Sequence, residues 1–353
     1  MFTQFYCGPC KGSTRSAMSC RCKNSVPELK CREDAEIVFT AANGAKNQIL
    51  SFRQSDKGFS FITATPTGGN GTGGSLDPLG SQGSLILSPD RNWLLCVNAG
   101  PRSSVSVFKA KEKPELCSNT PMTAIGTPVS VTMFRDLVFV LNSGAATLEG
   151  FKFNRGCLKS YTIVGIPEGG YGQVSFTPCG KNLVITSKTN NQIIVIPIDK
   201  DGMAGTPVIN KSNGVQPFGL AFSEKFLLVA EATTGAVSSY SINPDGTLTV
   251  ISGSVTNGQK ATCWIVQKKG FIVTSNPGSS TLSTYTVDKN GVVTLLNGAA
   301  VTGLVSTIDL AFGYKFLYAV DPGAGQIDGV WHSKVAITSP TLIPIFAQGL
   351  AVL

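Results

Sequence analysis

Short apolar runs separated by turn residues fill the chain from Glu36 to its end. One stretch holds four such runs, at 216–222, 226–231, 236–242 and 247–250. Their apolar residues alternate with polar ones or follow one another directly, and Gly, Pro and Asp lie between the runs. This pattern predicts four short β-strands joined by tight turns.

The four-strand unit is repeated along the chain. Its pattern recurs without a gap at 128–142 and at 307–321. The residue that ends the second strand is, in successive units, Asn43, Asn98, Asn142, Ser187, Glu231, Asn276 and Asp321, which gives spacings of 55, 44, 45, 44, 45 and 45 residues. A period of this length with four strands per unit is typical of propeller blades. The sequence therefore predicts an all-β fold, a seven-bladed β-propeller.

The two ends of the repeat complement each other. The unit that begins at Glu36 lacks a first strand, and residues 348–353 reproduce the pattern of 218–222. A C-terminal strand that completes the N-terminal blade would seal the ring and leave no free sheet edge. We expect one propeller domain over residues 35–353, preceded by an N-terminal extension at 1–34.

The one long spacing marks a longer connection between the first and second blades. It contains Gly68, Gly69, Gly71, Gly73 and Gly74, and we expect it to be a flexible loop. A phosphate-binding loop is not indicated, because no Lys-Ser/Thr pair and no predicted helix follow the glycines.

Cysteines crowd the N-terminal extension. Five of the ten lie at positions 7, 10, 20, 22 and 31. Such a cluster favours disulfides in an oxidising compartment, with zinc ligation as the alternative. The Cys7-Gly8-Pro9-Cys10 sequence resembles a thioredoxin redox motif but lacks the strand and helix that this chemistry needs. We expect a secreted, extracellular protein whose extension offers a surface to a protein partner; a cytoplasmic location is the alternative.

Composition and charge narrow the partners. The chain has 353 residues, of which 42% are hydrophobic and 14% charged, with 39 glycines, which fits short strands and many turns. The net charge of +8 is scattered and forms no basic stripe, so we expect no nucleic-acid partner. No apolar run is long enough to cross a bilayer, and the start of the chain has no signal-peptide core, so we expect no membrane partner.

The blade sequences resemble the lactonase-type seven-bladed propeller family, which includes 3-carboxy-cis,cis-muconate lactonizing enzymes and 6-phosphogluconolactonases. The resemblance is carried by LGSQGSLILSPDRNWLLCVNAG (79–100), GTPVSVTMFRDLVFVLNSG (126–144), GQVSFTPCGKNLVITSK (172–188) and QPFGLAFSEKFLLVAEA (216–232). It spans about residues 35–353 and implies the propeller fold, a polar site in the central channel and no cofactor.

The family's catalytic residues are largely replaced in this chain. The resemblance aligns the family's Pro-Arg-His with Pro217, Phe218 and Gly219. The family's Asn-Glu pair falls on Glu231 and Ala232, so the carboxylate is displaced by one residue. A shift of one residue in a strand points a side chain to the opposite face.

Polar side chains are expected to converge at one end of the channel, where second strands end and first strands begin. As catalytic candidates we take Glu231, because Glu is a poor turn residue, Asp309, because an acid in an apolar inner strand needs a partner, and Lys188, as an anion anchor paired with Glu231 from the neighbouring blade. The substrate-binding candidates are amides, hydroxyls and an acid: Asn98, Asn142, Gln173, Ser187, Asn276 and Asp321. Turn formation is the alternative role for the Asn and Asp residues among them.

Other chemistry is not indicated. The single histidine, His332, is predicted on an outer strand, so neither a catalytic triad nor a metal site is expected. Two functions stay open. The first is a lactonase-like enzyme that acts without cofactor on a small lactone or cyclisable carboxylic acid in the channel; the second is a non-catalytic secreted propeller that binds a small polar or carboxylated ligand or a protein.

Overall fold

The computed structural model describes residues 35–55, 58–331, 334–340 and 342–353. The N-terminal extension, with its expected disulfides and partner surface, and His332 lie outside the described residues.

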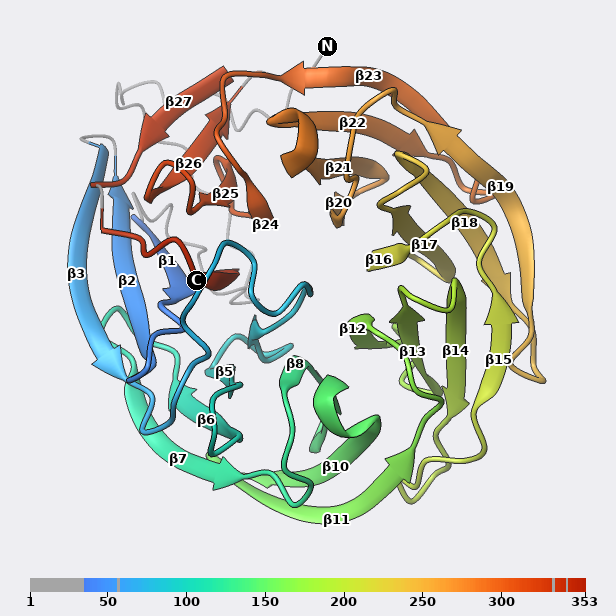
Figure 1. The fold of residues 1–353 in the computed structure, drawn as a ribbon, viewed down its shortest axis with the longest axis horizontal. Helices are drawn as coiled ribbons and strands as arrows, with labels where there is room; N and C mark the ends of the chain where they lie inside the picture. The colour runs from blue at the N-terminus through green and yellow to red at the C-terminus, as the bar shows by residue number, and fades with distance from the viewer. Residues whose placement is uncertain (1–34, 56–57, 332–333, 341) are drawn as a thin grey trace, which may run out of the picture.

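Seven four-stranded antiparallel sheets form a ring of blades around a central axis (Figure 1). The first three blades, each written from its inner to its outer strand, are β28 (Gln348–Val352), β1 (Glu36–Ala41), β2 (Gln48–Ser55) and β3 (Gly58–Pro66); β4 (Leu85–Leu87), β5 (Trp93–Asn98), β6 (Ser104–Lys109) and β7 (Glu115–Pro121); and β8 (Pro128–Phe134), β9 (Leu137–Asn142), β10 (Thr147–Asn154) and β11 (Cys157–Gly165).

The remaining four blades follow the same order. They are β12 (Tyr171–Phe176), β13 (Asn182–Ser187), β14 (Gln192–Pro197) and β15 (Val208–Lys211); β16 (Pro217–Ser223), β17 (Phe226–Glu231), β18 (Ala236–Ile242) and β19 (Leu248–Thr256); β20 (Trp264–Lys268), β21 (Phe271–Asn276), β22 (Thr281–Val287) and β23 (Val293–Val301); and β24 (Ile308–Phe312), β25 (Leu317–Asp321), β26 (Gln326–Trp331) and β27 (Lys334–Thr338). Two single-turn 3-10 helices, η1 (Ser143–Ala145) and η2 (Pro277–Ser279), follow β9 and β21.

The seven-bladed prediction and its register are confirmed. Six of the seven predicted second strands end at the predicted residue, and only β1 ends earlier, at Ala41 rather than Asn43. These strands are apolar on both faces because a blade packs against a neighbour on each side; β17, for example, is buried at every position. Outer strands are more exposed, and in β27 exposed and partly buried residues alternate.

The ring closes as the sequence predicts. β28 pairs antiparallel with β1, with Val38 opposite Val352 and Thr40 opposite Leu350. A buried polar contact links the last blade to the first, where the Tyr318 hydroxyl donates to Glu36 Oε2 over 2.7 Å. Closure therefore leaves the inner strands of all seven blades facing a common channel.

Candidate functional site

The long connection between β3 and β4 enters this channel. In Figure 1 the chain between these strands runs inward to the middle of the ring. We call residues 76–84 of it the crossing segment. Its backbone and side chains bond the inner strands of other blades: Gln82 N–H donates to the Gly172 carbonyl over 2.9 Å, and the Gly83 carbonyl accepts from Val131 N–H over 2.9 Å.

The inner strand β20 also forms hydrogen bonds with the crossing segment. The Gln82 amide bonds the backbone of Ile265 in both directions, as acceptor from N–H over 3.0 Å and as donor to the carbonyl over 2.8 Å. The Trp264 indole N–H donates to the Ser81 carbonyl over 3.0 Å. Ser81 and Gln82 are buried. The additional residues of the longest repeat thus fill the channel centre.

Part of the expected glycine loop packs closely against the blades, and its flexibility stays a prediction. A Cβ on Gly69 would lie 2.4 Å from the Asn98 side chain, and one on Gly71 would lie 2.2 Å from the Asn43 backbone. Gly73 and Gly74 adopt positive φ angles of 58° and 97°. Gly69 and Gly71 therefore allow the connection to approach the first two blades closely, whereas Gly73 and Gly74 have open space beside them and allow the left-handed backbone.

A pocket of about 590 Å³ lies beside the crossing segment. Its charged lining residues are Asp77, Lys188 and Lys260. Phe218, Trp264, Ile308 and Ala232 contribute an apolar wall, and Cys263 lies next to Trp264. The lining therefore combines one acid from the crossing segment with groups from the fourth to seventh blades.

Asp77 is the acid of this pocket. Its Oδ1 accepts from the Gln348 amide over 2.6 Å and from Gly80 N–H over 3.0 Å. Burial raises its pKa to about 6, although these hydrogen bonds and the charge of Lys188 act in the opposite direction. Its φ of 50° is in the left-handed region, so the backbone holds it in a strained geometry that is often found at functional sites.

Lys188, predicted from the sequence as a site residue, lies in the pocket. Its ammonium donates to the Gly80 carbonyl and lies 4.9 Å from the centroid of the Phe218 ring. Burial lowers its pKa, and the charge of Asp77 partly compensates. The lysine therefore contacts the crossing segment and the apolar wall together.

Asp309, the second predicted catalytic residue, is buried in the channel near Asp77. Burial is the main cause that raises its pKa to about 8, and the charge of Asp77 raises it further. Its Oδ1 accepts from Leu310 N–H over 2.9 Å. It has a φ of 40° at a position where the inner strands of two other blades have Gly219 and Gly349. A strained acid, protonated near neutral pH, thus lies behind the pocket.

Glu231, the third candidate, lies elsewhere and forms no pair with Lys188. Its Oε1 accepts from Gly214 N–H over 2.8 Å and from the Ser238 hydroxyl over 2.6 Å, and its Oε2 accepts from the Ser254 hydroxyl over 2.7 Å. It is fully buried. The acid that acts electrostatically on Lys188 is Asp77 instead, because the crossing segment brings into the pocket an acid that no repeat position contains.

The predicted substrate-binding residues do not line the pocket. Asp321 accepts from Val305 N–H and Ser306 N–H, each over 2.8 Å, and the Asn142 amide donates to the Ala124 carbonyl over 2.7 Å. In both cases the partner is the loop that leads into the blade. The others accept hydrogen bonds from neighbouring segments: Asn98 from the Thr67 hydroxyl, Asn276 from the Thr262 hydroxyl and Gln173 from Leu220 N–H. Ser187 is buried. Their role in substrate binding stays a prediction.

Sequence reasoning missed Asp77 and Trp264. The signal for Asp77 was the spacing of 55 residues, because the additional residues of one repeat must lie outside the regular four-stranded sheets. No comparable signal existed for Trp264, whose position beside the channel depends on the packing of β20.

Other site types find little support in the described part of the chain. No group of three His, Cys, Asp or Glu side chains there has a geometry that holds a metal ion. Within the same ranges no helix has the length and apolar character to span a membrane. Cys96, Cys117, Cys157, Cys179 and Cys263 are free thiols in the structure. The disulfides expected of the N-terminal cluster lie outside the described residues and stay a prediction.

Comparison with known proteins agrees with this architecture. Residues 182–303 match the family described as Lactonase, 7-bladed beta-propeller. No curated protein matches the sequence.

Several solved structures share the fold. A protein from Lactobacillus plantarum superposes with a TM-score of 0.72 at 15% identity, over 90% of this chain and 99% of that chain. The periplasmic gluconolactonase PpgL of Pseudomonas aeruginosa gives 0.71 at 15% identity, over 90% and 98%. A putative 6-phosphogluconolactonase from Bacteroides fragilis gives 0.68 at 17% identity, over 91% and 99%. At such identities the likeness concerns the fold.

Proposed function

We propose that this chain, a lactonase-type seven-bladed β-propeller, hydrolyses a small lactone or forms one from a cyclisable carboxylic acid. The premise is its fold together with the family match over residues 182–303. The observation that supports this most is the meeting of Asp77 and Lys188 in one channel pocket. An acid that titrates near neutral pH beside a cation is what ester hydrolysis requires.

Asp77 acts as the general base. With a pKa of about 6 it is mostly ionised at pH 7 while still accepting a proton effectively. It takes one proton from a water molecule as the water oxygen attacks the lactone carbonyl carbon. When the ring C–O bond breaks, the same proton passes to the departing ring oxygen. One lactone and one water give one hydroxy acid, and lactone formation is the reverse.

Lys188 stabilises the negative oxygen that forms on the carbonyl. An ammonium has three N–H donors, and the Gly80 carbonyl accepts one of them, so two remain for a ligand. Its partial burial strengthens the attraction, because water screens the charge less. The reaction moves protons and breaks an ester bond without electron transfer, so we propose that it needs no cofactor.

A hydrolysis assay on a panel of small lactones tests this function. Release of acid, followed by pH-stat titration, is expected for at least one lactone and is expected to be lost in Asp77→Asn. If every lactone on the panel is hydrolysed no faster than in buffer, and no hydroxy acid is cyclised, the enzymatic proposal is wrong.

A second candidate function is ligand binding without turnover. It is favoured by the replacement of the family's catalytic groups, because Phe218 and Ala232 present apolar surface to the pocket. Saturable binding in the pocket, measured by calorimetry, with no turnover would support this function.

Secretion is proposed on the cysteine cluster of residues 1–34 alone. Thiol titration of the denatured chain is the direct test. Five of the ten cysteines are free thiols in the structure, so about six reactive thiols would indicate two disulfides within residues 1–34, and ten would indicate a reducing compartment.

A further inference from the structure

The side chain of Gln82, in the crossing segment, bonds to the inner strand β20 as a neighbouring strand would. Its carboxamide accepts from Ile265 N–H over 3.0 Å and donates to the Ile265 carbonyl over 2.8 Å. Ile265 is fully buried, so its N–H and carbonyl groups need a partner within the protein. A two-way bond to one residue fixes both the position and the orientation of the Gln82 side chain.

The inner strand β16 leaves room for this side chain. A Cβ on Gly219 would lie 2.3 Å from Gln82 Oε1 and 2.7 Å from the Cys263 carbonyl oxygen. Gly219 has no positive φ, so the close approach of these two groups, and not the backbone conformation, requires glycine here. On β28, a Cβ on Gly349 would likewise lie 2.7 Å from Ser84 Oγ. The ring therefore accommodates the crossing segment at particular glycine positions.

The residues just before Gln82 carry contacts of the charged groups in the pocket. The Lys188 ammonium donates to the Gly80 carbonyl, and Gly80 N–H donates to Asp77 Oδ1 over 3.0 Å. Only Ser81 separates Gly80 from Gln82. A displacement of Gln82 would therefore move Gly80, and with it the contacts of Asp77 and Lys188.

We propose that Gln82 is a positioning residue of the pocket: seated against Gly219 and bonded to Ile265, it holds the crossing segment so that Asp77 stays shielded from water beside Lys188. This inference rests on the proposed function only for its kinetic readout. Burial is the main cause that raises the pKa of Asp77, so a loosened segment would let water reach the carboxylate and lower that pKa.

Carbon-13 NMR titration of the carboxyl groups tests the inference without a substrate. Gln82→Met keeps a side chain of similar length but neither hydrogen bond, so the midpoint of Asp77 is expected to fall from about 6 to below about 5. Gln267→Met is the matched control, because the Gln267 amide donates to the Phe222 carbonyl and so links the same two strands, β20 and β16, toward their other end. Its Asp77 midpoint should stay near 6. A midpoint near 6 in Gln82→Met as well overturns the inference and leaves the proposed function standing.

Gly219→Ala tests the same contact from the other side. The added methyl group would collide with Gln82 Oε1 while Gln82 itself is unchanged, so the Asp77 midpoint should fall in this variant too. An unchanged circular dichroism spectrum shows that a variant is folded. If Gln82→Met does not fold, Gly219→Ala decides, and an Asp77 midpoint near 6 in this variant overturns the inference.

The pH dependence of turnover separates positioning from a purely structural role. With any lactone that the wild type hydrolyses, the acid limb of the pH–rate profile should move to lower pH in Gln82→Met, together with the Asp77 midpoint. Reduced turnover with an unmoved limb would mean that Gln82 supports only the fold, which overturns the inference. If the wild type hydrolyses no lactone, the proposed function fails and the NMR midpoints still decide the inference.

Discussion

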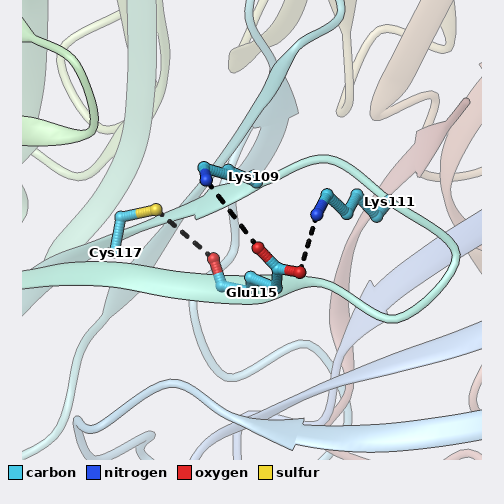
Figure 2. Close-up of polar contacts among 4 residues, drawn as sticks. All are labelled: Lys109, Lys111, Glu115 and Cys117. Carbon is cyan, nitrogen blue, oxygen red and sulfur yellow. Dashed lines mark hydrogen bonds and ion pairs between the residues drawn. The ribbon is translucent and has the colours of Figure 1, made fainter.

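The molecule has two clusters in which a carboxylate lies near lysine, one on the outer rim and one in the central pocket. The pKa of the carboxylate is lowered in the first cluster and raised in the second. On the rim, Glu115 lies 2.6 Å from Lys111 and 3.9 Å from Lys109 (Figure 2). About half of each side chain is exposed, and the hydrogen bond from Lys111 is the main cause that lowers the pKa of Glu115. In the pocket, burial outweighs the charge of Lys188 and raises the pKa of Asp77 to about 6.

The difference shows that access of water, rather than the presence of a lysine, sets the state of the acid. An exposed carboxylate keeps its hydration and gains only the attraction of its partners, whereas a buried one loses hydration that one lysine does not replace. The rim cluster is therefore an ordinary surface feature, and the pocket cluster is suited to proton transfer.

The largest expected effect is that of Asp77→Asn. Asparagine keeps an oxygen that accepts from Gln348 and Gly80 but takes up no proton, so turnover should fall by about 100-fold or more. The measurement is kcat/KM on the best lactone of the panel. Turnover within about twofold of the wild-type value would show that another group is the base.

Lys188→Met should reduce kcat/KM by about 10- to 100-fold, because the anionic oxygen loses its cation. It should also move the acid limb of the pH–rate profile upward. In the wild type, turnover falls as the pH drops through about 6, because Asp77 then becomes protonated. Removing the charge of Lys188, which lowers the pKa of Asp77, raises the pH at which turnover is half-maximal. Lys200→Met, at a side chain that is 90% exposed, is the control. If the acid limb of the variant stays at the wild-type pH, the charge of Lys188 does not lower the pKa of Asp77.

Asp309→Asn should change how stability depends on pH. The folded pKa of about 8 lies above the usual 3.8, so the folded state holds this proton more tightly and the free energy of unfolding falls as pH rises from about 4 to about 8. The variant should lose this contribution and exceed the wild type by roughly 2–5 kcal/mol above pH 8. Urea unfolding at pH 5 and pH 9 measures it, with exposed Asp201→Asn as the control. Parallel changes in wild type and variant would contradict the assignment.

Glu231→Gln should reduce stability by roughly 1–3 kcal/mol and leave kcat unchanged. The reason is that one of its two accepting oxygens is lost from a buried network with Gly214, Ser238 and Ser254. Urea unfolding and the lactone assay measure the two effects, and exposed Glu224→Gln is the control. A large loss of kcat with normal stability would restore Glu231 as a catalytic residue.

Glu115→Gln should have the smallest effect, with no measurable change in the thermal unfolding midpoint or in turnover, because exposed ion pairs contribute little. Thermal unfolding and the lactone assay measure this. A clearly lower unfolding midpoint would mean that the rim cluster supports the outer strand β7.

The repeat made six of the seven second-strand ends predictable to the residue. Strand ends and ring closure follow from a pattern that every blade repeats, and Ser187 or Glu231 could be placed by counting. The site was less predictable for the same reason. Asp77 belongs to an insertion outside the repeat, so no other blade showed where it would lie. The structure places Lys188 at the pocket and Asp309 in the channel, and their catalytic roles stay a prediction; the acid beside them depends on how the crossing segment packs.

The polar residues that end the second strands show a further limit. Asp321 and Glu231 are acids in an apolar context, which from sequence is compatible with a binding site or with a structural one. Both accept from backbone N–H groups of loops that lead into their blades. That contact is tertiary, so sequence position alone did not separate the two roles.

The most direct test of the account is a carbon-13 NMR titration of the aspartate and glutamate carboxyl groups in the wild-type protein. The account predicts that Asp77 titrates near pH 6 while Glu115 titrates below the usual range for glutamate. A midpoint for Asp77 at or below pH 4 would contradict it, because the pocket acid would then be an ordinary hydrated carboxylate like the one on the rim.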